Sequence, residues 1–460
     1  MRWRGAVRAM VLRPCASAVA RAWPPSLSAP EMRKISPEAL EFASLLQPGD
    51  GLAWGQAAAE PLTLTRALMA QRQGLSGIHA FCGIGWADTL DPAYTDALRF
   101  TSYCGTARNR LLQAAGQLDI LPVHYSGLEA ALAPRVDVLL IQIAEGRIPG
   151  TFSFSLACEY LAPLVKSARL VIAELNSQAP STPGMVTITR DEIDILVPVC
   201  RALPLPPEAK GDAVQARIAE RIAALIPEGA ILQVGLGALP EAILSRLHHH
   251  RHLGLHSGLF TEGMAGLIHA GVVDNSTKAA ARGVSVTGLI TGGEAAWALA
   301  QETDLIRLAP TSYTHALPVL AALPKLVAIN AGLEVDLTGQ VNSEVAAGAY
   351  VGAIGGGTDF ARGAAASAGG LPLLALPSAR RGRDGRLISA IVPALGGPVS
   401  LSRADAGVIV TEEGVADLRG QPFAERALRL IRVAHPELRE DLSREARDRG
   451  LLRPHHLRRD

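Results

Sequence analysis

Short continuous apolar runs alternate with amphipathic patterns along most of the chain. Two segments, 212–226 and 423–434, repeat apolar positions at the spacing of a helix. Five other runs have the length and continuity of buried parallel strands, at 136–144 (VDVLLIQIA), 168–175, 326–335, 371–378 and 406–414. This alternation predicts layers of helices packed on mainly parallel sheets, an α/β fold.

Two parts of the chain repeat the same order of features. Segments beginning at Pro48 and Pro227 each contain a glycine, an apolar strand, a loop of small residues, a second proline and an amphipathic helix. This predicts two duplicated α/β domains, joined by the Pro-rich stretch 202–212. We therefore divide the 460 residues into an extension, two domains and a basic tail, at 1–34, 35–205, 206–445 and 446–460.

The first thirty residues differ from the rest of the chain. Five arginines precede the first acidic residue, Glu31, among Ala, Pro and Ser. This composition is typical of an organellar transit peptide, which would place the protein in mitochondria. We favour the alternative that the reading frame is extended upstream of Met32, with a cytoplasmic location, and we leave the segment out of the fold argument.

Composition narrows the function classes. A formal charge of +1 with 19% charged residues gives no basic surface for nucleic acid, and no apolar run approaches the length of a membrane span. The five scattered cysteines form no CxxC pair, so we expect reduced thiols and neither a disulfide framework nor a zinc site.

Two glycine-rich loops are candidates for ligand binding. In 234–242 (VGLGALPEA) the glycines follow a strand and precede a helix, where backbone amides favour an anion, although a tight structural turn explains the loop equally well. In 350–364 three glycines occur in a row, at 355–357. We favour a backbone that approaches a ligand or donates amides to an oxyanion over a flexible linker.

Isolated acidic and histidine residues carry less information. Consecutive histidines in 248–252 cannot all face one ion, so this run predicts a solvated loop and no metal site. His315 is by default a structural histidine. The stretch 253–263 (LGLHSGLFTEG) reads as a strand end that enters a polar loop, with Gly258 at its tip and Glu262 shortly after.

Taken together, these segments resemble the acetyl-CoA hydrolase/transferase family, which includes 4-hydroxybutyrate and succinyl-CoA:acetate CoA-transferases. The resemblance runs in order from about residue 35 to 445. Its motifs lie at 55–62 (GQAAAEPL), 234–244, 255–273, 329–344 (INAGLEVDLTGQVNSE), 355–364, 376–378, 410–420 and 431–442.

This resemblance implies two tandem CoA-transferase-type (NagB/RpiA-like) open α/β domains with the site at their interface, in a homodimer. It implies acyl-CoA and a small carboxylate as substrates and no bound cofactor. A glutamate of such enzymes attacks the thioester and forms a glutamyl anhydride, then a glutamyl-CoA thioester. The positions that match the family's CoA-binding and oxyanion segments are Gly235, Leu236, Gly237, Ala238, Leu239, Glu334, Gly355 and Gly356.

The chain departs from the family pattern at the nucleophile. The attacking glutamate aligns with Gly258, and His315 falls about where family members often carry an asparagine. We therefore expect transfer to fail and water to attack the thioester instead. His315 is our first candidate for the general base, with Glu334 and Glu262 as alternatives. The competing interpretations are a non-catalytic CoA-binding or scaffold protein and, more distantly, a sugar-phosphate isomerase.

Overall fold

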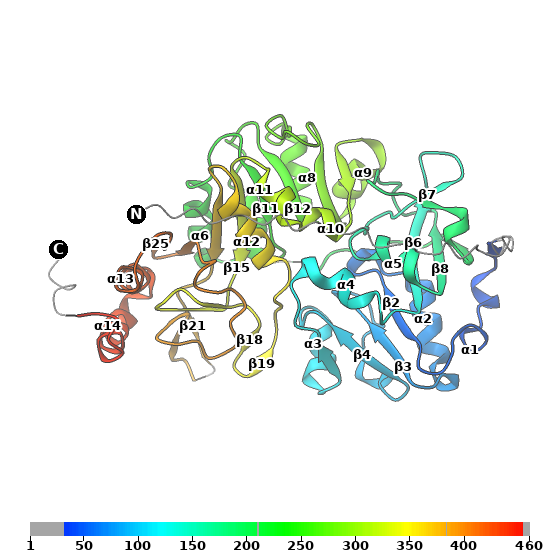
Figure 1. Ribbon diagram of the computed structural model, residues 1–460, viewed down its shortest axis with the longest axis horizontal. Coiled ribbons are helices and arrows are strands. Elements are labelled where there is room, and N and C mark those ends of the chain that lie inside the picture. The colour runs from blue at the N-terminus through cyan, green and yellow to red at the C-terminus, as the bar shows by residue number, and fades with distance from the viewer. Residues whose placement is uncertain (1–31, 209–210, 383, 454–460) are drawn as a thin grey trace, which may run out of the picture.

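The computed structural model describes residues 32–208, 211–382 and 384–453, and these form two α/β domains that lie side by side along the long axis of the molecule (Figure 1). Residues 1–31 of the expected extension and residues 454–460 of the expected basic tail lie outside the described residues. Arg33 and Lys34 form the edge strand β1.

Within the described residues, the first domain contains a ten-stranded sheet. Its main path is parallel throughout, and β7 (Thr151–Ser153) pairs antiparallel with β6 and with β9 (Ile188–Thr189). The spatial order of the main path is β1 (Arg33–Lys34), β10 (Ile195–Val199), β8 (Leu170–Asn176), β6 (Val138–Glu145), β2 (Gly51–Trp54), β3 (Ile78–Phe81), β4 (Leu98–Ser102) and β5 (Leu118–Ile120).

The second domain is built on an eight-stranded sheet, in which only the last described pair is antiparallel. Its order is β14 (Ile306–Leu308), β13 (Ser285–Ile290), β12 (Gly254–Phe260), β11 (Ile231–Val234), β15 (Leu326–Ala331), β20 (Leu371–Ala375), β24 (Val408–Thr411) and β25 (Gly414–Asp417). Smaller sheets combine β16 (Glu334–Asp336), β17 (Val341–Asn342) and β23 (Ile391–Val392), β18 (Val345–Ala346) with β19 (Ala349–Tyr350), and β21 (Ala379–Arg381) with β22 (Leu387–Ser389).

The two sheets share the order and direction of seven strands and differ at one edge, where β1 is parallel to β10 and β25 is antiparallel to β24. In the first, β2 lies between β3 and β6, and in the second, β11 lies between β12 and β15. The segment after Pro48 forms β2 and α2 (Leu62–Gln71), and the segment after Pro227 forms β11 and α7 (Ala238–Leu244). The predicted duplication of α/β domains is therefore confirmed.

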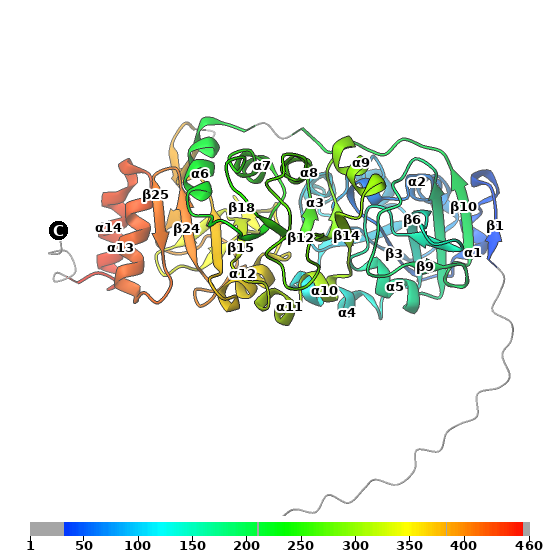
Figure 2. The ribbon, with the colours of Figure 1, turned by 90° about the horizontal axis from the view of Figure 1, so that it is seen from above.

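Helices pack against both sheets, as the apolar alternation predicts. The first domain contributes α1 (Phe42–Leu45), α2, α3 (Asn109–Ala114), α4 (Leu128–Leu132) and α5 (Leu161–Ser167). The second contributes α6 (Ala213–Ala223), α7, α8 (Glu262–His269), α9 (Glu294–Glu302), α10 (Thr311–Thr314), α11 (Leu317–Ala321), α12 (Gly357–Ala366), α13 (Phe423–Val433) and α14 (Arg439–Asp448). Figure 2 shows the Pro-rich segment running along one edge from β10 to α6, with no helix or strand in its described residues.

Two sequence predictions need correction. The apolar run 326–335 is not one strand, because it leaves the main sheet after Ala331 and Glu334 begins β16 in a separate small sheet. The strand predicted to end near Gly258 continues as β12 to Phe260, since Leu259 and Phe260 still pair with β13. Gly258 therefore lies inside a strand and not at the tip of a loop.

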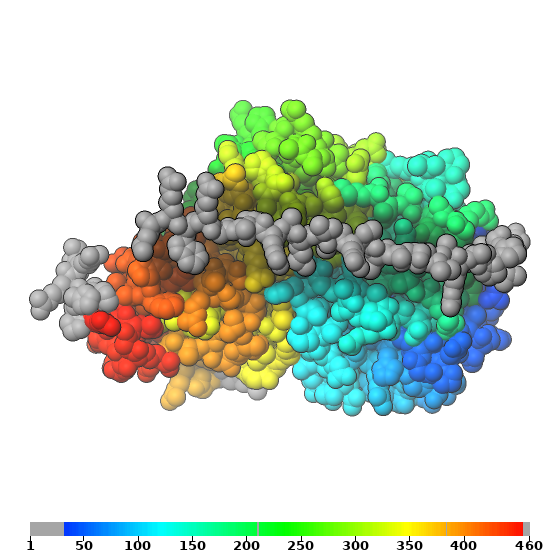
Figure 3. Space-filling view, viewed as in Figure 1, coloured from blue at the N-terminus to red at the C-terminus, as the bar shows by residue number. Residues whose placement is uncertain are grey.

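The two domains share one buried apolar core. Leu156 and Cys158 of the first domain pair with β13, through Ile290 N to Leu156 O at 2.8 Å and Cys158 N to Gly288 O at 2.9 Å. A second contact joins Gly105 N to Gly352 O at 2.9 Å. Figure 3 shows the cyan surface of the first domain lying against the yellow surface of the second. The core cluster is continuous across this boundary, which fixes the domains against each other.

In the described part of the chain, no helix is long and apolar enough to cross a bilayer. No group of His, Cys, Asp or Glu side chains there could hold a metal ion, and the histidine run 248–252 is a loop with mostly exposed side chains. The cysteines there are unpaired, with Cys200 exposed and Cys82, Cys104 and Cys158 buried.

Candidate active site

The carboxyl ends of the two sheets face each other and enclose a cavity of about 160 Å³, called here the interface cavity. The first domain lines it with residues that follow its strands, Gln56, Ile84, Tyr103 and Tyr125, together with Glu159. The second domain lines it with Gln233, Val234, Gly235, Gly258, Leu259, His315, Asn330, Gly355, Gly356, Gly357 and Phe360.

The cavity exists because strands separate at this point. β11 and β12 pair only at Ile231–Gly254 and Leu232–Leu255, and β15 lies on the other side of β11. The chain passes from β11 to β12 on one side and returns after β14 to β15 on the other side of β11. Open α/β sheets bind ligands at the carboxyl ends of the strands where the strand order reverses in this way. Because the first sheet repeats this topology around β2, two such positions meet at the domain interface.

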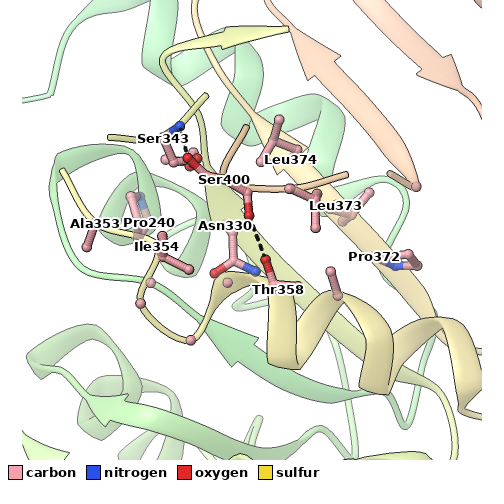
Figure 4. A pocket seen from close by; sticks show the side chains of 18 of the residues that line it. Pro240, Asn330, Ser343, Ala353, Ile354, Thr358, Pro372, Leu373, Leu374 and Ser400 are labelled. Atoms are coloured by element: carbon pink, nitrogen blue, oxygen red, sulfur yellow. Dashed lines mark hydrogen bonds between the residues drawn. The ribbon is translucent and has the colours of Figure 1, made fainter. Parts of the chain in front are cut away.

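A second cavity of about 270 Å³ adjoins the first and is lined by the second domain alone, so we call it the second-domain cavity (Figure 4). It shares Gly235, Asn330 and the glycines 355–357 with the interface cavity. Thr358 Oγ1 donates to Ser400 O at 3.0 Å, and Ser400 Oγ accepts from Ser343 N at 2.9 Å, which holds the far wall together.

The predicted CoA-binding loop lies at the boundary between the two cavities. Gly235 lines both, and Leu236 lines the second-domain cavity with 43% of its surface exposed. Gly237 precedes α7 at φ +126°, a conformation that favours glycine. Ala238 begins α7 and Leu239 packs into the core, so these three residues shape the loop without appearing among the residues that line either cavity.

The second glycine loop faces the first across both cavities. Gly355 has φ +53°, and its carbonyl accepts a hydrogen bond from Tyr125 N at 3.0 Å, so the first domain holds the loop in place. Helix α12 begins at Gly357 directly after it. First-turn amides of a helix have no partner within the helix, so they can donate to an oxygen in the cavity.

The imidazole of His315 fills the space beside Gly258. A Cβ added at Gly258 would lie 2.9 Å from His315 Cε1 and 3.0 Å from Nε2, and one at Gly356 would lie 2.5 Å from Nε2. At such distances one of the two groups must shift, so a side chain at either position would displace the His315 ring or the backbone beside it. The ring also packs against Tyr125 and Phe360, at centroid distances of 4.9 and 4.7 Å.

His315 is held in this position by its neighbours. Its Nδ1 lies 2.8 Å from Thr314 Oγ1, and the carbonyl of Thr314 accepts a hydrogen bond from His256 Nε2 at 3.0 Å. Burial lowers the pKa of His315 to about 3, and the nearby His256 makes a smaller contribution in the same direction. The imidazole is therefore neutral at pH 7, as expected, but it is a weak proton acceptor.

The other two carboxylates of the sequence prediction lie elsewhere. Glu262 begins α8 and accepts hydrogen bonds from the first-turn amides of α9, Gly293 N at 2.7 Å, Ala295 N at 3.1 Å and Ala296 N at 3.3 Å. Glu334 accepts from Gly396 N at 3.0 Å and Asn342 Nδ2 at 3.2 Å. Neither is among the described residues that line the two cavities.

The sequence reasoning missed the carboxylate that does line the interface cavity. Glu159 is 2% exposed and accepts hydrogen bonds from Gln56 Nε2 at 2.7 Å and from the hydroxyl of Tyr125. In the sequence, Glu159 stands out only as the single acidic residue in an otherwise apolar stretch between Leu156 and Leu161. Acids in such surroundings are rarely buried without a partner or a function.

Comparisons with known proteins agree with this geometry. The N-terminal domain of acetyl-CoA hydrolase/transferase matches residues 29–199, and the C-terminal domain matches residues 292–446. The chain is 33% identical to the 4-hydroxybutyrate coenzyme A transferase of Clostridium kluyveri over 86% of this chain and 93% of that protein. It is 31% identical to the succinyl-CoA:cyclohexane-1-carboxylate CoA transferase of Geobacter metallireducens, over 89% and 94% of the two chains.

A solved structure shares the whole fold. RipA from Yersinia pestis superimposes with a TM-score of 0.84 and 31% identity, over 91% of this chain and 98% of that chain. Both domains thus belong to one known architecture. The chain belongs to the acetyl-CoA hydrolase/transferase family, a family of acyl-CoA-processing enzymes.

Proposed function

We propose that this enzyme hydrolyses acyl-CoA thioesters and does not transfer CoA between carboxylic acids. The observation that carries the proposal is the filled space at Gly258. A glutamate there is the family nucleophile by resemblance, and here even a Cβ at that position would lie within 3.0 Å of the His315 ring. Without that carboxylate, the glutamyl anhydride of the transfer route cannot form at residue 258.

The charge of the interface cavity supports the same conclusion. A transferase must admit a carboxylate as acceptor, and a cation is the usual means of holding one. No lysine or arginine is among the described residues that line this cavity, whereas Glu159 is. A negative acceptor would therefore enter an uncompensated site, while water would not.

The remaining parts of the site suit thioester binding. We assign the loop around Gly235 and the second-domain cavity to the CoA part of the substrate, and the interface cavity to the acyl group. The backbone amides at Gly356 and Gly357 would polarise the thioester carbonyl and stabilise the oxyanion that forms when water attacks. We propose that the enzyme acts as a homodimer, as the family resemblance implies.

A panel of acyl-CoAs tests this function by measurement of free thiol, with and without added acetate. We expect thiol release from at least one acyl-CoA at a rate that acetate does not change. Rapid appearance of acetyl-CoA in the presence of acetate would contradict hydrolysis. Tight CoA binding with no turnover of any acyl-CoA would instead support the scaffold alternative.

A further inference from the structure

Glu159 has no assigned role, although it lies on the first-domain wall of the interface cavity. It follows β7 on the segment that docks against β13, and its backbone carbonyl accepts from Thr311 N at 3.4 Å. Gly258 and the 355–357 glycines line the same cavity from the other domain. A thioester carbonyl placed near the glycine amides would therefore face the carboxylate of Glu159.

The carboxylate is oriented by a network that belongs to the first domain. Gln56 Oε1 accepts from Ile84 N at 2.8 Å and from the hydroxyl of Tyr103 at 2.9 Å, which fixes the direction of its amide. Its Nε2 then donates to Glu159 Oε1, and the hydroxyl of Tyr125 donates to Oε2. Each carboxylate oxygen thus has one fixed donor and keeps a lone pair for a water molecule.

Burial makes Glu159 a stronger base than an ordinary carboxylate. Desolvation raises its pKa to about 7, against the opposing effect of the hydrogen bonds from Tyr125 and Gln56. The other titratable groups around it are Tyr103, Tyr125, Tyr160, Cys158 and His315. Burial raises the pKa of each phenol and of the Cys158 thiol and lowers that of His315 to about 3. Glu159 is thus the member of this group that titrates near neutral pH.

We infer that Glu159 is the general base that takes a proton from the attacking water, an inference that rests on the proposed hydrolysis. The water oxygen bonds to the thioester carbonyl carbon as its proton passes to a Glu159 oxygen. The tetrahedral oxyanion then collapses, the C–S bond breaks, and the protonated Glu159 returns the proton to the departing CoA sulfur. The products are a carboxylic acid and CoA thiol, and Glu159 is restored.

The test compares Glu159→Gln with Glu60→Gln, both assayed for thiol release from pH 5 to 9. Glu60 is an equally buried glutamate of the same domain whose pKa is also raised to about 7 by burial, but it bonds to Thr65 and Thr89 and is not among the residues that line either cavity. We expect Glu159→Gln to lower kcat by roughly 10²- to 10⁴-fold and to abolish the rise of activity near pH 7. Glu60→Gln should retain both.

A second variant tests the assignment even where Glu159→Gln folds poorly. Tyr125→Phe removes one donor to the carboxylate, so the pKa of Glu159 should rise and the midpoint of the pH profile should move to higher pH. A profile whose midpoint stays in place in Tyr125→Phe, or wild-type activity in Glu159→Gln, would overturn the role of Glu159 alone.

Isotope labelling separates a base from a nucleophile. During turnover in H₂¹⁸O, a general base leaves all of the label in the product acid. Label in the Glu159 side chain, or reduction of that side chain to an alcohol with release of CoA thiol on borohydride treatment, would overturn the assignment as base. Absence of thiol release by the wild-type enzyme from every acyl-CoA would instead overturn the proposed function and this inference together.

Discussion

At the scale of single residues, Gly258 and His315 form a pair in which each determines what the other can be. The imidazole packs between Gly258 and Gly356 at distances that leave no room for a Cβ. Overpacking of this kind typically costs about 1–3 kcal/mol, so a side chain at 258 displaces the ring or the strand. By the family resemblance, these two positions correspond to the glutamate nucleophile and to an asparagine of family transferases.

We predict that Gly258→Glu alone destabilises the protein and gives no CoA transfer, whereas Gly258→Glu with His315→Asn gains it. Asparagine is shorter than histidine and frees the space that the new carboxylate needs. The measurement is formation of acetyl-CoA from another acyl-CoA and acetate, with His315→Asn as the control. Equal transfer by Gly258→Glu with and without the second substitution would show that the ring is no obstacle.

A second residue-scale prediction concerns Glu60 and the dependence of stability on pH. Burial raises the pKa of Glu60 from 4.5 to about 7, so the folded protein holds a proton that the unfolded chain has released. The resulting destabilisation is absent below pH 4.5, grows as the pH rises and is complete above about 7, where it amounts to about 3 kcal/mol. Glu60→Gln should therefore raise the free energy of unfolding in urea at pH 8 but not at pH 4.5.

At the scale of elements, helix α9 is secured at both ends by residues from outside it. Glu262 accepts from its first-turn amides, and Arg147 of the first domain donates to the carbonyls of Ala300, Gln301 and Thr303 at its other end. A negative charge at the start of a helix and a positive charge at its end both interact favourably with the helix dipole. These contacts give Glu262, an acid close to Gly258 in the sequence, a structural role at the start of α9.

Glu262→Ala should therefore reduce stability and spare activity. Loss of the three amide contacts is expected to lower the free energy of unfolding by about 1–2 kcal/mol. Thiol release per folded molecule should stay within about twofold of wild type, since general-base loss would lower it by roughly 10²-fold or more. A large fall in kcat with unchanged urea stability would restore Glu262 as a catalytic candidate.

The elements were more predictable than the site. Continuous apolar runs such as 136–144 and 371–378 identify buried strands because both faces of a parallel sheet are covered, and β6 and β20 confirm them. The break after Ala331 was not predictable, since period and hydrophobicity do not say which sheet a strand joins. Glu159 was missed for a similar reason: its approach to Gly258 depends on how one domain docks on the other.

At the scale of the whole molecule, the cavity belongs to neither domain alone. The continuous core and the contacts of Arg147 hold the two sheets with their carboxyl ends facing. Residues that follow corresponding strands, Gln56 after β2 and Gly235 after β11, thereby meet in one site. One copy of the duplicated unit supplies the loop to which we propose that the CoA part binds, and the other supplies hydrogen-bond donors for Glu159.

We predict that the two domains unfold as one unit and that Arg147→Ala weakens the contact between them. The arginine donates to three carbonyls and pairs with Asp304 across the interface, with Nη1 to Oδ1 at 2.6 Å. Its loss should lower stability by about 1–3 kcal/mol. Calorimetry should show a single transition for wild type and a lower or divided one for the variant; two separate wild-type transitions would contradict the shared core.

The position of the His315 ring beside Gly258 also favours one order of substitutions at these two residues. A sequence that acquired a glutamate at 258 first would pass through a destabilised intermediate, because a Cβ there would lie within 3.0 Å of the His315 ring. Replacing the histidine first opens that space and leaves a viable intermediate. If transfer is gained through a glutamate at residue 258, we therefore expect the substitution at residue 315 to come first.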